Sequence, residues 1–142
     1  MAIASVVADA NALLSAAIGK AALKVFTEFG LTVHMAAFNA SEVQKYLPDL
    51  AAKYGLPAHW AELQWKLLPV KMHPCNDYSD FYSEALAELA ERDPEDAHAL
   101  ALARKLRLPL WSNDRDLAGL GVECYSTARL LALLKKERES SR

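Results

Sequence analysis

The chain has 142 residues, of which 53% are hydrophobic and 24% charged, and its formal net charge at pH 7 is -2. These values predict one globular domain with a sizeable core, formed by residues 1–136 and followed by a polar tail at 137–142. The net charge gives no general attraction to nucleic acid, so a polyanion would need local basic residues or bound cations. No apolar run reaches the roughly 18 residues of a membrane helix, and the N-terminus lacks the basic region of a signal peptide. The two cysteines, Cys75 and Cys124, have no metal-type spacing, and we expect a cytoplasmic protein that does not contact membranes.

Apolar runs alternate with helical stretches along the whole chain. Five strands are expected at 3–8, 31–35, 67–72, 108–111 and 121–124. Helices are expected after the first strand with a break at Gly19, and at 39–55, 58–66, 79–91, 93–107 and 126–136. Asn39 or Ser41 is the expected cap of the second helical region, and Pro48 is expected to kink or end its first part. The alternation predicts an α/β fold of three layers, α/β/α, with a central parallel sheet of about five strands.

The stretch 92–114 gives the first indication of a site. Asp93 is a good N-cap, Pro94 suits the first helical position, and the basic Arg107 suits the helix end. A short strand follows almost at once, so helix and strand should run antiparallel. Asp96, near the start of the helix, and Asp114, just past the strand, are therefore expected at the same edge of the sheet.

Further acids are expected at this edge, because sites in parallel sheets form at the carboxyl ends of the strands. Asp9 follows the first strand directly, and Glu42 lies in the first turn of the helix after the second strand. The predicted site thus gathers four acids from four distant segments: Asp9, Glu42, Asp96 and Asp114. Asp93 and Asp116 should lie close by.

Each acid also has an ordinary structural explanation. Helix capping, a helix-dipole contact or a turn would account for Asp9, Glu42, Asp93, Asp96, Asp114 and Asp116 one at a time. Their conjunction is harder to explain, because two carboxylates about 4 Å apart repel by roughly 4 kcal/mol at an effective dielectric of about 20. A fold that gathers four carboxylates needs a cation, and oxygen-only ligands indicate Mg²⁺ or Mn²⁺. Such a centre suits phosphoryl chemistry with an activated water.

Other sequence features support no rival chemistry. The histidines are scattered, without a nucleophile motif, and His98 is expected on a helix surface. No Gly-rich phosphate loop follows the first strand. The tryptophans are expected in the core or an interface rather than as base-stacking platforms: Trp60, Trp65 and Trp111. Several basic residues could contact phosphates or merely solvate a face: Lys45, Lys53, Arg92, Lys105 and Arg115.

Four segments, in order and over nearly the whole chain, resemble the motifs of the PIN-domain nucleases. They are Val6-Val7-Ala8-Asp9-Ala10-Asn11, Ser41-Glu42-Val43, Asp93-Pro94-Glu95-Asp96-Ala97 with its apolar continuation, and Trp111-Ser112-Asn113-Asp114-Arg115-Asp116. The fold implied by this resemblance is the α/β sandwich predicted above. Ala10 departs from the family pattern, since many members carry Thr or Ser at this place.

The resemblance implies a metal-dependent endoribonuclease that attacks RNA phosphodiesters with activated water. Asp9 would be the central ligand of Mg²⁺ or Mn²⁺, with Asp96 and Asp114 completing the inner site. Glu42 would bind a second metal or position water, and Ser112 and Asn11 would orient ligands. Small stand-alone members are often toxins of VapC-type toxin–antitoxin pairs, so an antitoxin and a homodimer are possible partners besides RNA.

Two alternatives remain open at this point. A response-regulator-like module also gathers acids at a sheet edge, but this chain has Ala8 beside Asp9 instead of an acid pair, and Ser126-Thr127 in place of the expected lysine. The second is a PIN-like scaffold that binds nucleic acid or protein without turnover, which a cleavage assay would distinguish.

Overall fold

The computed structural model describes residues 3–114 and 120–140. Its centre is a sheet of five strands in the order β3-β2-β1-β4-β5, and all neighbouring strands are parallel. The strands are β1 (Ser5–Ala8), β2 (Thr32–Ala36), β3 (Val70–His73), β4 (Leu110–Trp111) and β5 (Cys124–Tyr125). The predicted α/β class and five-stranded parallel sheet are thereby confirmed.

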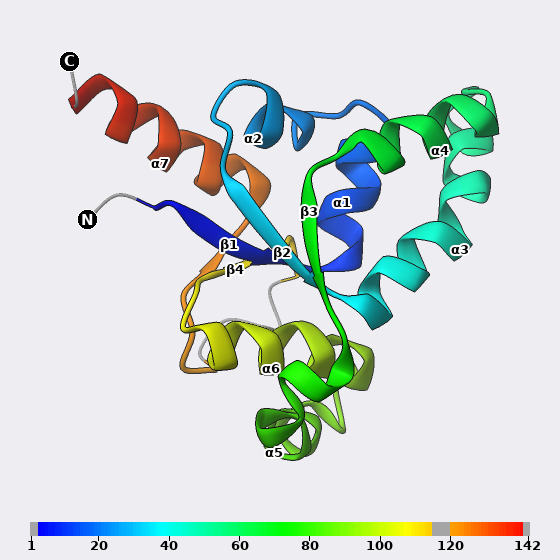
Figure 1. Cartoon of the computed structure of the whole chain (residues 1–142). Helices are drawn as coiled ribbons and strands as arrows, with labels where there is room; N and C mark the ends of the chain where they lie inside the picture. Colours follow the sequence, from blue (N-terminus) through cyan, green and yellow to red (C-terminus); the bar gives the residue numbers. More distant parts are fainter. Residues whose placement is uncertain (1–2, 115–119, 141–142) are drawn as a thin grey trace.

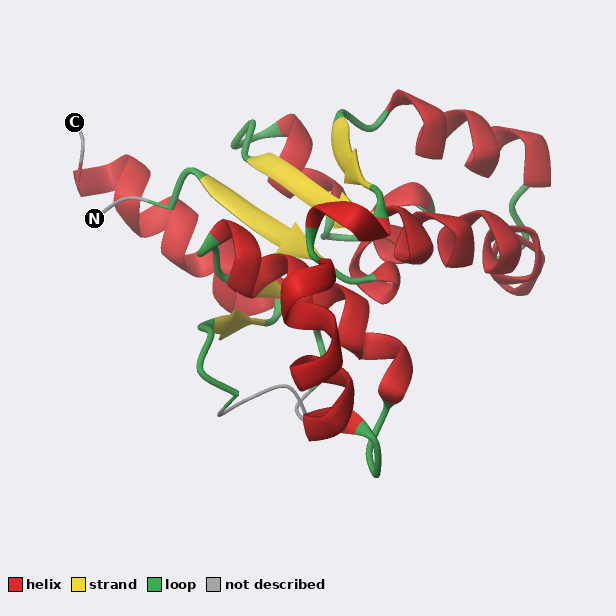
Figure 2. Cartoon of the chain, turned by 60° about the horizontal axis from the view of Figure 1, so that its bottom comes forward, coloured by secondary structure: helices red, strands yellow, loops and turns green. Residues whose placement is uncertain are grey.

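Helices cover both faces of this sheet (Figure 1). One face carries α1 (Ala10–Ala17), α2 (Leu23–Thr27), α3 (Ala37–Lys53), α4 (Ala58–Leu67) and α7 (Thr127–Ser140). The opposite face carries α5 (Ser79–Leu89) and α6 (Ala97–Leu106). Figure 2 shows the same layers with the strands between the two sets of helices. Two short 3₁₀ turns, η1 (Cys75–Asp77) and η2 (Pro94–Asp96), precede α5 and α6.

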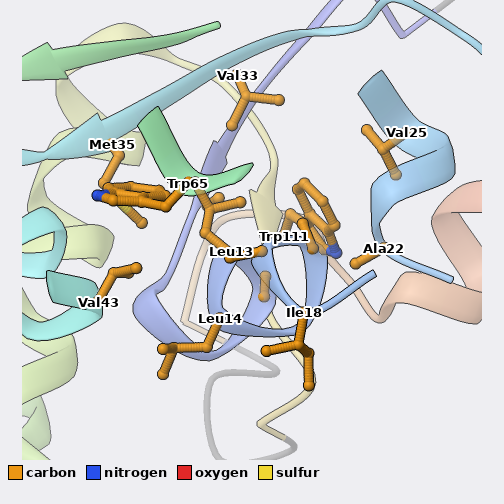
Figure 3. Close-up of a cluster of buried hydrophobic side chains, with 14 of the residues drawn as sticks. Leu13, Leu14, Ile18, Ala22, Val25, Val33, Met35, Val43, Trp65 and Trp111 are labelled. Atoms are coloured by element: carbon orange, nitrogen blue, oxygen red, sulfur yellow. The ribbon is translucent and has the colours of Figure 1, made fainter. Parts of the chain in front are cut away.

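The strands are apolar on both faces because each face has its own core. In β1, Val6 and Ala8 pack in the larger core while Val7 packs in the smaller one beneath α6. In β4, Trp111 and Leu110 divide in the same way. Figure 3 shows the larger core, with Trp111 between α1 and α2 and Trp65 beside Met35 and Val43. Trp65 and Trp111 are therefore core residues as expected, whereas 40% of Trp60 is exposed.

Helix α3 differs from its prediction. It begins at Ala37, neither Asn39 nor Ser41 caps it, and it continues through Pro48 to Lys53. A proline removes one backbone hydrogen bond and strains a helix interior. Here the buried face of α3 packs into the larger core through Val43 and Leu47, and this packing holds the helix together.

The C-terminal helix also extends further than expected. Helix α7 continues to Ser140 rather than ending near Lys136, so residues 137–140 of the predicted tail are helical. The Glu137 carboxylate accepts hydrogen bonds of 3.0 and 3.1 Å from the Ile3 amide, which ties α7 to the start of β1. Within the part of the chain that the structure describes, no helix combines the length and apolarity that a membrane crossing needs.

The turn between α6 and β4 is tight, as the placement of Asp96 and Asp114 at one edge requires. Arg107 ends α6 in the left-handed conformation, with φ of 57°, and the Leu108 amide donates a 3.0 Å hydrogen bond to the Ala103 carbonyl. Helix C-termini usually place glycine at such a position. Arg107 is the only non-glycine residue with positive φ in the described chain.

Replacing Arg107 by glycine should raise the free energy of unfolding by about 1 kcal/mol. A side chain in the left-handed region costs roughly 1–2 kcal/mol, and the greater freedom of unfolded glycine offsets part of this gain. Urea denaturation measures the difference. Arg107→Ala is the control, because it removes the same exposed side chain but keeps the strain. A glycine variant no more stable than the alanine variant would contradict this account.

Candidate functional site

Asp9 is the most buried acid of the site, with 3% of its surface exposed. It follows β1 and caps α1, where its Oδ1 accepts a 2.9 Å hydrogen bond from the Ala12 amide. Its own amide donates to the Trp111 carbonyl at 3.1 Å, which continues the pairing of β1 with β4. The backbone of Asp9 is therefore held by the sheet and its side chain by the helix.

Ser112 connects Asp9 to the loop after β4. Its hydroxyl donates a 2.5 Å hydrogen bond to Asp9 Oδ2 and accepts a 3.0 Å hydrogen bond from the Asp114 amide. The Ser112 amide in turn donates to the Tyr125 carbonyl of β5 at 3.0 Å. One buried hydroxyl thus sets the orientation of the Asp9 carboxylate and the path of the chain toward Asp114.

The start of the α6 region is a 3₁₀ turn, and this changes the expected role of Asp93. Asp93 does act as a cap, but of η2, through a 3.3 Å hydrogen bond from the Glu95 amide to its Oδ1. The Asp96 amide donates to the Asp93 carbonyl at 3.1 Å. Because residues three apart eclipse in a 3₁₀ helix, Asp93 and Asp96 lie on one side. Carboxylate oxygens of Asp93, Asp96 and Asp114 all lie within 4.8 Å of one another.

Burial and like-charge repulsion disfavour the charged form of the carboxyl groups in this cluster. The pKa of Asp96 is raised to about 8 by burial, by a hydrogen bond with Asp114, and by the negative charges of Asp93, Asp9 and Asp114. Burial also raises the pKa of Asp9, against the lowering effect of the hydrogen bonds from Ser112 and Ala12. Two acids with raised pKa values side by side favour either a bound proton or a bound cation.

Glu42 lies on α3, next to Glu95 of η2, an acid that was not predicted for the site. The pKa of Glu42 is raised chiefly by burial and also by the neighbouring Glu95 and Asp93. Asn39, which is 2% exposed, opposes this shift by donating a 2.8 Å hydrogen bond from Nδ2 to Glu42 Oε1. Asn39 therefore orients Glu42, three residues along the helix, instead of capping α3.

One cavity of about 190 Å³ joins these groups. Its lining residues are Asp9, Ala10, Asn11, Leu14, Asn39, Glu42, Tyr46, Asp93, Glu95 and Asp96. Three of the four acids predicted for the site thus line a single cavity together with Asp93, and Asp114 adjoins it through its contact with Asp96. The predicted Asn11 lies at its rim, and Ala10 offers no hydroxyl there. Arg115 and the predicted Asp116 lie outside the described residues.

Sequence reasoning missed Asn39, Glu95 and Tyr46 as members of the cavity. The spacing held a signal for two of them, since Asn39 and Tyr46 are three and four residues from Glu42 on one helix. Glu95 had no such signal, because its position depends on the 3₁₀ turn.

The residues fit a hard divalent cation. Oδ2 of Asp96 is buried and has no hydrogen-bond partner among the described residues, so an acceptor is left without a donor. Its neighbours in the cluster are carboxylate oxygens, the ligands that Mg²⁺ and Mn²⁺ prefer.

His98 differs from its predicted place on an open helix surface. Its ring stacks on Phe38 with centroids 4.1 Å apart and an interplanar angle of 13°. Its Nδ1 shares a 2.7 Å hydrogen bond with the Tyr78 hydroxyl. Burial lowers the pKa of His98, so the ring is neutral at pH 7.

The protein is thus of the α/β class, with a five-stranded parallel sheet and a cluster of acidic side chains at the edge where the strands end. The family model described as "PIN domain" matches residues 7–135. The chain therefore belongs to the PIN-domain family, whose members are in general nucleases. No curated protein matches the chain.

A solved structure supports the same fold. The chain is similar to one described as a "Toxin-antitoxin complex from Klebsiella pneumoniae", with a TM-score of 0.64 and 20% identity. The match covers 86% of this chain and 97% of that one.

The stability of the metal-free protein should fall as pH rises from about 4 through about 8. Asp96 has a folded pKa of about 8 against an ordinary value of 3.8, so the native state holds its proton more tightly than the unfolded state does. The resulting stabilisation is lost as the native carboxyl ionises. Asp96→Asn cannot titrate, so thermal melting in EDTA should show a smaller fall for this variant than for wild type. Mg²⁺ should raise the melting temperature of wild type but hardly that of Asp96→Asn.

Asp93→Ala is the matched comparison for this experiment. It removes the cap of η2, at a cost of about 1 kcal/mol, and it keeps a titrating Asp96 whose pKa should fall somewhat, because one of the neighbouring negative charges is gone. A variant Asp96→Asn that melts earlier than wild type at pH 8 would show that repulsion is not the dominant effect.

Proposed function

We propose that this protein is a metal-dependent endoribonuclease that cleaves RNA phosphodiesters with metal-activated water. The single observation that carries the proposal is the cavity that Asp9, Glu42 and Asp96 line together, with Asp114 beside Asp96. Burial raises the pKa of Asp9, Glu42 and Asp96, and the negative charges of neighbouring acids add to each shift, an arrangement that destabilises the chain unless a proton or a cation is bound.

The residues have distinct roles in this proposal. Asp9, Asp96 and Asp114 hold a Mg²⁺ or Mn²⁺ ion, and Glu42 holds a second ion or orients the attacking water. When bound, the metal polarises the phosphodiester and lowers the pKa of water. Ser112 keeps the Asp9 carboxylate in one orientation through its 2.5 Å hydrogen bond. Asn39 does the same for Glu42 at 2.8 Å.

The proposed biological role is that of a toxin held inactive by an antitoxin, with a homodimer as the assembled form. It is supported by the PIN-domain match and by the resemblance of the fold to a chain of a toxin–antitoxin complex. A small DNA-binding protein encoded beside this chain that suppresses its RNA cleavage would support this role. A neighbour without effect on cleavage would count against it.

Purified protein should cleave unstructured single-stranded RNA in Mg²⁺ or Mn²⁺ and should be silent in EDTA. The physical reason is that the described residues lining the acid cavity include several carboxylates and no lysine or arginine, so a bound cation has to supply the positive charge that stabilises the phosphate. Gel analysis of labelled RNA, with metal restored after chelation, measures the effect. Undiminished cleavage after exhaustive chelation would rule out the mechanism. RNA binding without cleavage in either metal would favour a binding module instead.

Asp9→Asn and Asp114→Asn should each lower the cleavage rate at least about tenfold. Each change keeps the shape of the side chain but removes a charged ligand, and about 1.4 kcal/mol of lost transition-state stabilisation is tenfold in rate. Asp80→Asn is the matched control, because the Asp80 side chain is 75% exposed and pairs with Lys105 at 3.6 Å on the far side of the fold. Asp93→Ala should lower the rate less than either of the two ligand changes, because Asp93 caps η2 and is not one of the three proposed ligands, although its carboxylate lies within 4.8 Å of those of Asp96 and Asp114. Near-wild-type rates for Asp9→Asn and Asp114→Asn, with metal still bound, would refute the assignment.

A further inference from the structure

Two exposed aromatic rings flank Glu42 on helix α3. Phe38 and Tyr46 precede and follow Glu42 by four residues each, so the three side chains form one stripe along the helix. Phe38 is 38% exposed and Tyr46 is 45% exposed. The helix thus presents a ring on each side of an acid of the candidate site, while its buried face packs in the core.

The Phe38 ring is fixed in orientation. It stacks on His98, whose ring is held by the Tyr78 hydroxyl at 2.7 Å and by the Tyr82 ring at a centroid distance of 4.7 Å. His98 lies two residues after Asp96, and Figure 1 shows the start of α3 close to the start of α6. The ring of Phe38 is therefore held between the two helices that supply Glu42 and Asp96.

The Tyr46 ring lies at the boundary of two cavities. It lines the acid cavity of about 190 Å³ and also an open groove of about 650 Å³ between α1 and α3. Lys53 lines the far part of this groove, and the Lys45 ammonium lies 5.3 Å from the centroid of the Tyr46 ring. Asp49 also lines the groove, so its own lining carries one charge of each sign, and Lys45 beside the Tyr46 ring adds a second positive charge for a polyanionic strand that leaves the acid cavity over Tyr46.

We propose that Phe38 and Tyr46 are stacking platforms for the two unpaired bases on either side of the phosphate that is cleaved, an inference that rests on the proposed ribonuclease function. Eight helical residues separate the two rings by about 12 Å along the axis, several times the 3.4 Å rise of stacked bases. Bases held on the two platforms are therefore unstacked from each other. Only a single strand allows this, so the substrate is unpaired RNA.

A nucleobase is the occupant that the charges favour. The acids of the cavity repel phosphates in the absence of metal, so binding there needs a contribution that does not depend on charge. A ring that stacks on a base supplies it for every base, with about 1–3 kcal/mol per base. The platforms hold the strand without selecting its sequence.

The test measures binding of a fluorescent, unstructured single-stranded RNA to the purified protein in EDTA. Phe38→Ala and Tyr46→Ala should each weaken binding at least about fivefold, the equivalent of about 1 kcal/mol. Phe38→Tyr and Tyr46→Phe keep a ring and should bind like wild type. Trp60→Ala is the matched control, because Trp60 is 40% exposed but lies on α4, off the stripe.

A second measurement separates stacking from a structural effect. Phe38→Leu keeps apolar cover over His98, so it should melt like wild type yet bind RNA as weakly as Phe38→Ala. With an RNA of only two nucleotides, whose length limits its register, an abasic site in place of one base should then remove the further effect of Phe38→Ala, and an abasic site in place of the other should remove that of Tyr46→Ala. A blunt RNA duplex should compete poorly, because its bases are already stacked.

The outcomes distinguish this proposal from the ribonuclease proposal. If Phe38→Ala and Tyr46→Ala bind RNA as tightly as wild type, the platform proposal is overturned, whereas the cleavage result still stands. The two rings would then be a surface for a protein partner. Ring-dependent RNA binding without cleavage in Mg²⁺ or Mn²⁺ would refute the ribonuclease and keep the platforms. No RNA binding by wild type in EDTA would overturn the platforms, and cleavage in Mg²⁺ or Mn²⁺ would still decide the ribonuclease proposal.

Discussion

The burial of Asp9 beneath other carboxylates is the constraint on which the rest of the site depends. A carboxylate that is 3% exposed loses most of its hydration, and the Ala12 amide and Ser112 hydroxyl only partly replace it. Asp114 and Asp93 add negative charge to the same place, which raises the pKa of Asp9 further. The native state accepts this cost because β1, β4 and the first turn of α1 fix the backbone of Asp9 independently of its charge.

The elements around Asp9 are arranged so that repulsion does not separate the acids. The 3₁₀ geometry of η2 places Asp93 and Asp96 on one side, and the short turn at Arg107 returns the chain to β4 beside β1. Helix α6 is held by apolar packing against β1 and α5 rather than by its acidic start. A change that relieves the charge of the cluster therefore affects function before it affects the fold.

Helix α3 links this acidic centre to its surroundings. Its buried face anchors it in the larger core, its Glu42 enters the acid cavity through the hydrogen bond from Asn39, and its exposed stripe carries aromatic rings. Core packing thus belongs to one face of the helix, whereas Glu42 and the proposed contacts with substrate share another. The resemblance to a chain of a toxin–antitoxin complex concerns the fold, whereas this arrangement of side chains belongs to the present sequence.

The sequence by itself determined the parallel sheet and the convergence of Asp9, Glu42 and Asp96 on one cavity, with Asp114 beside it. Apolar strands and amphipathic helices are local patterns, and the right order of strands and helices brings strand ends to a common edge. Only the tertiary structure decided how the side chains between these landmarks pair. Glu95 joins the site because the chain forms a 3₁₀ turn, and His98 stacks on Phe38 because α3 and α6 begin side by side. These contacts join residues far apart in the sequence, so no local pattern encodes them.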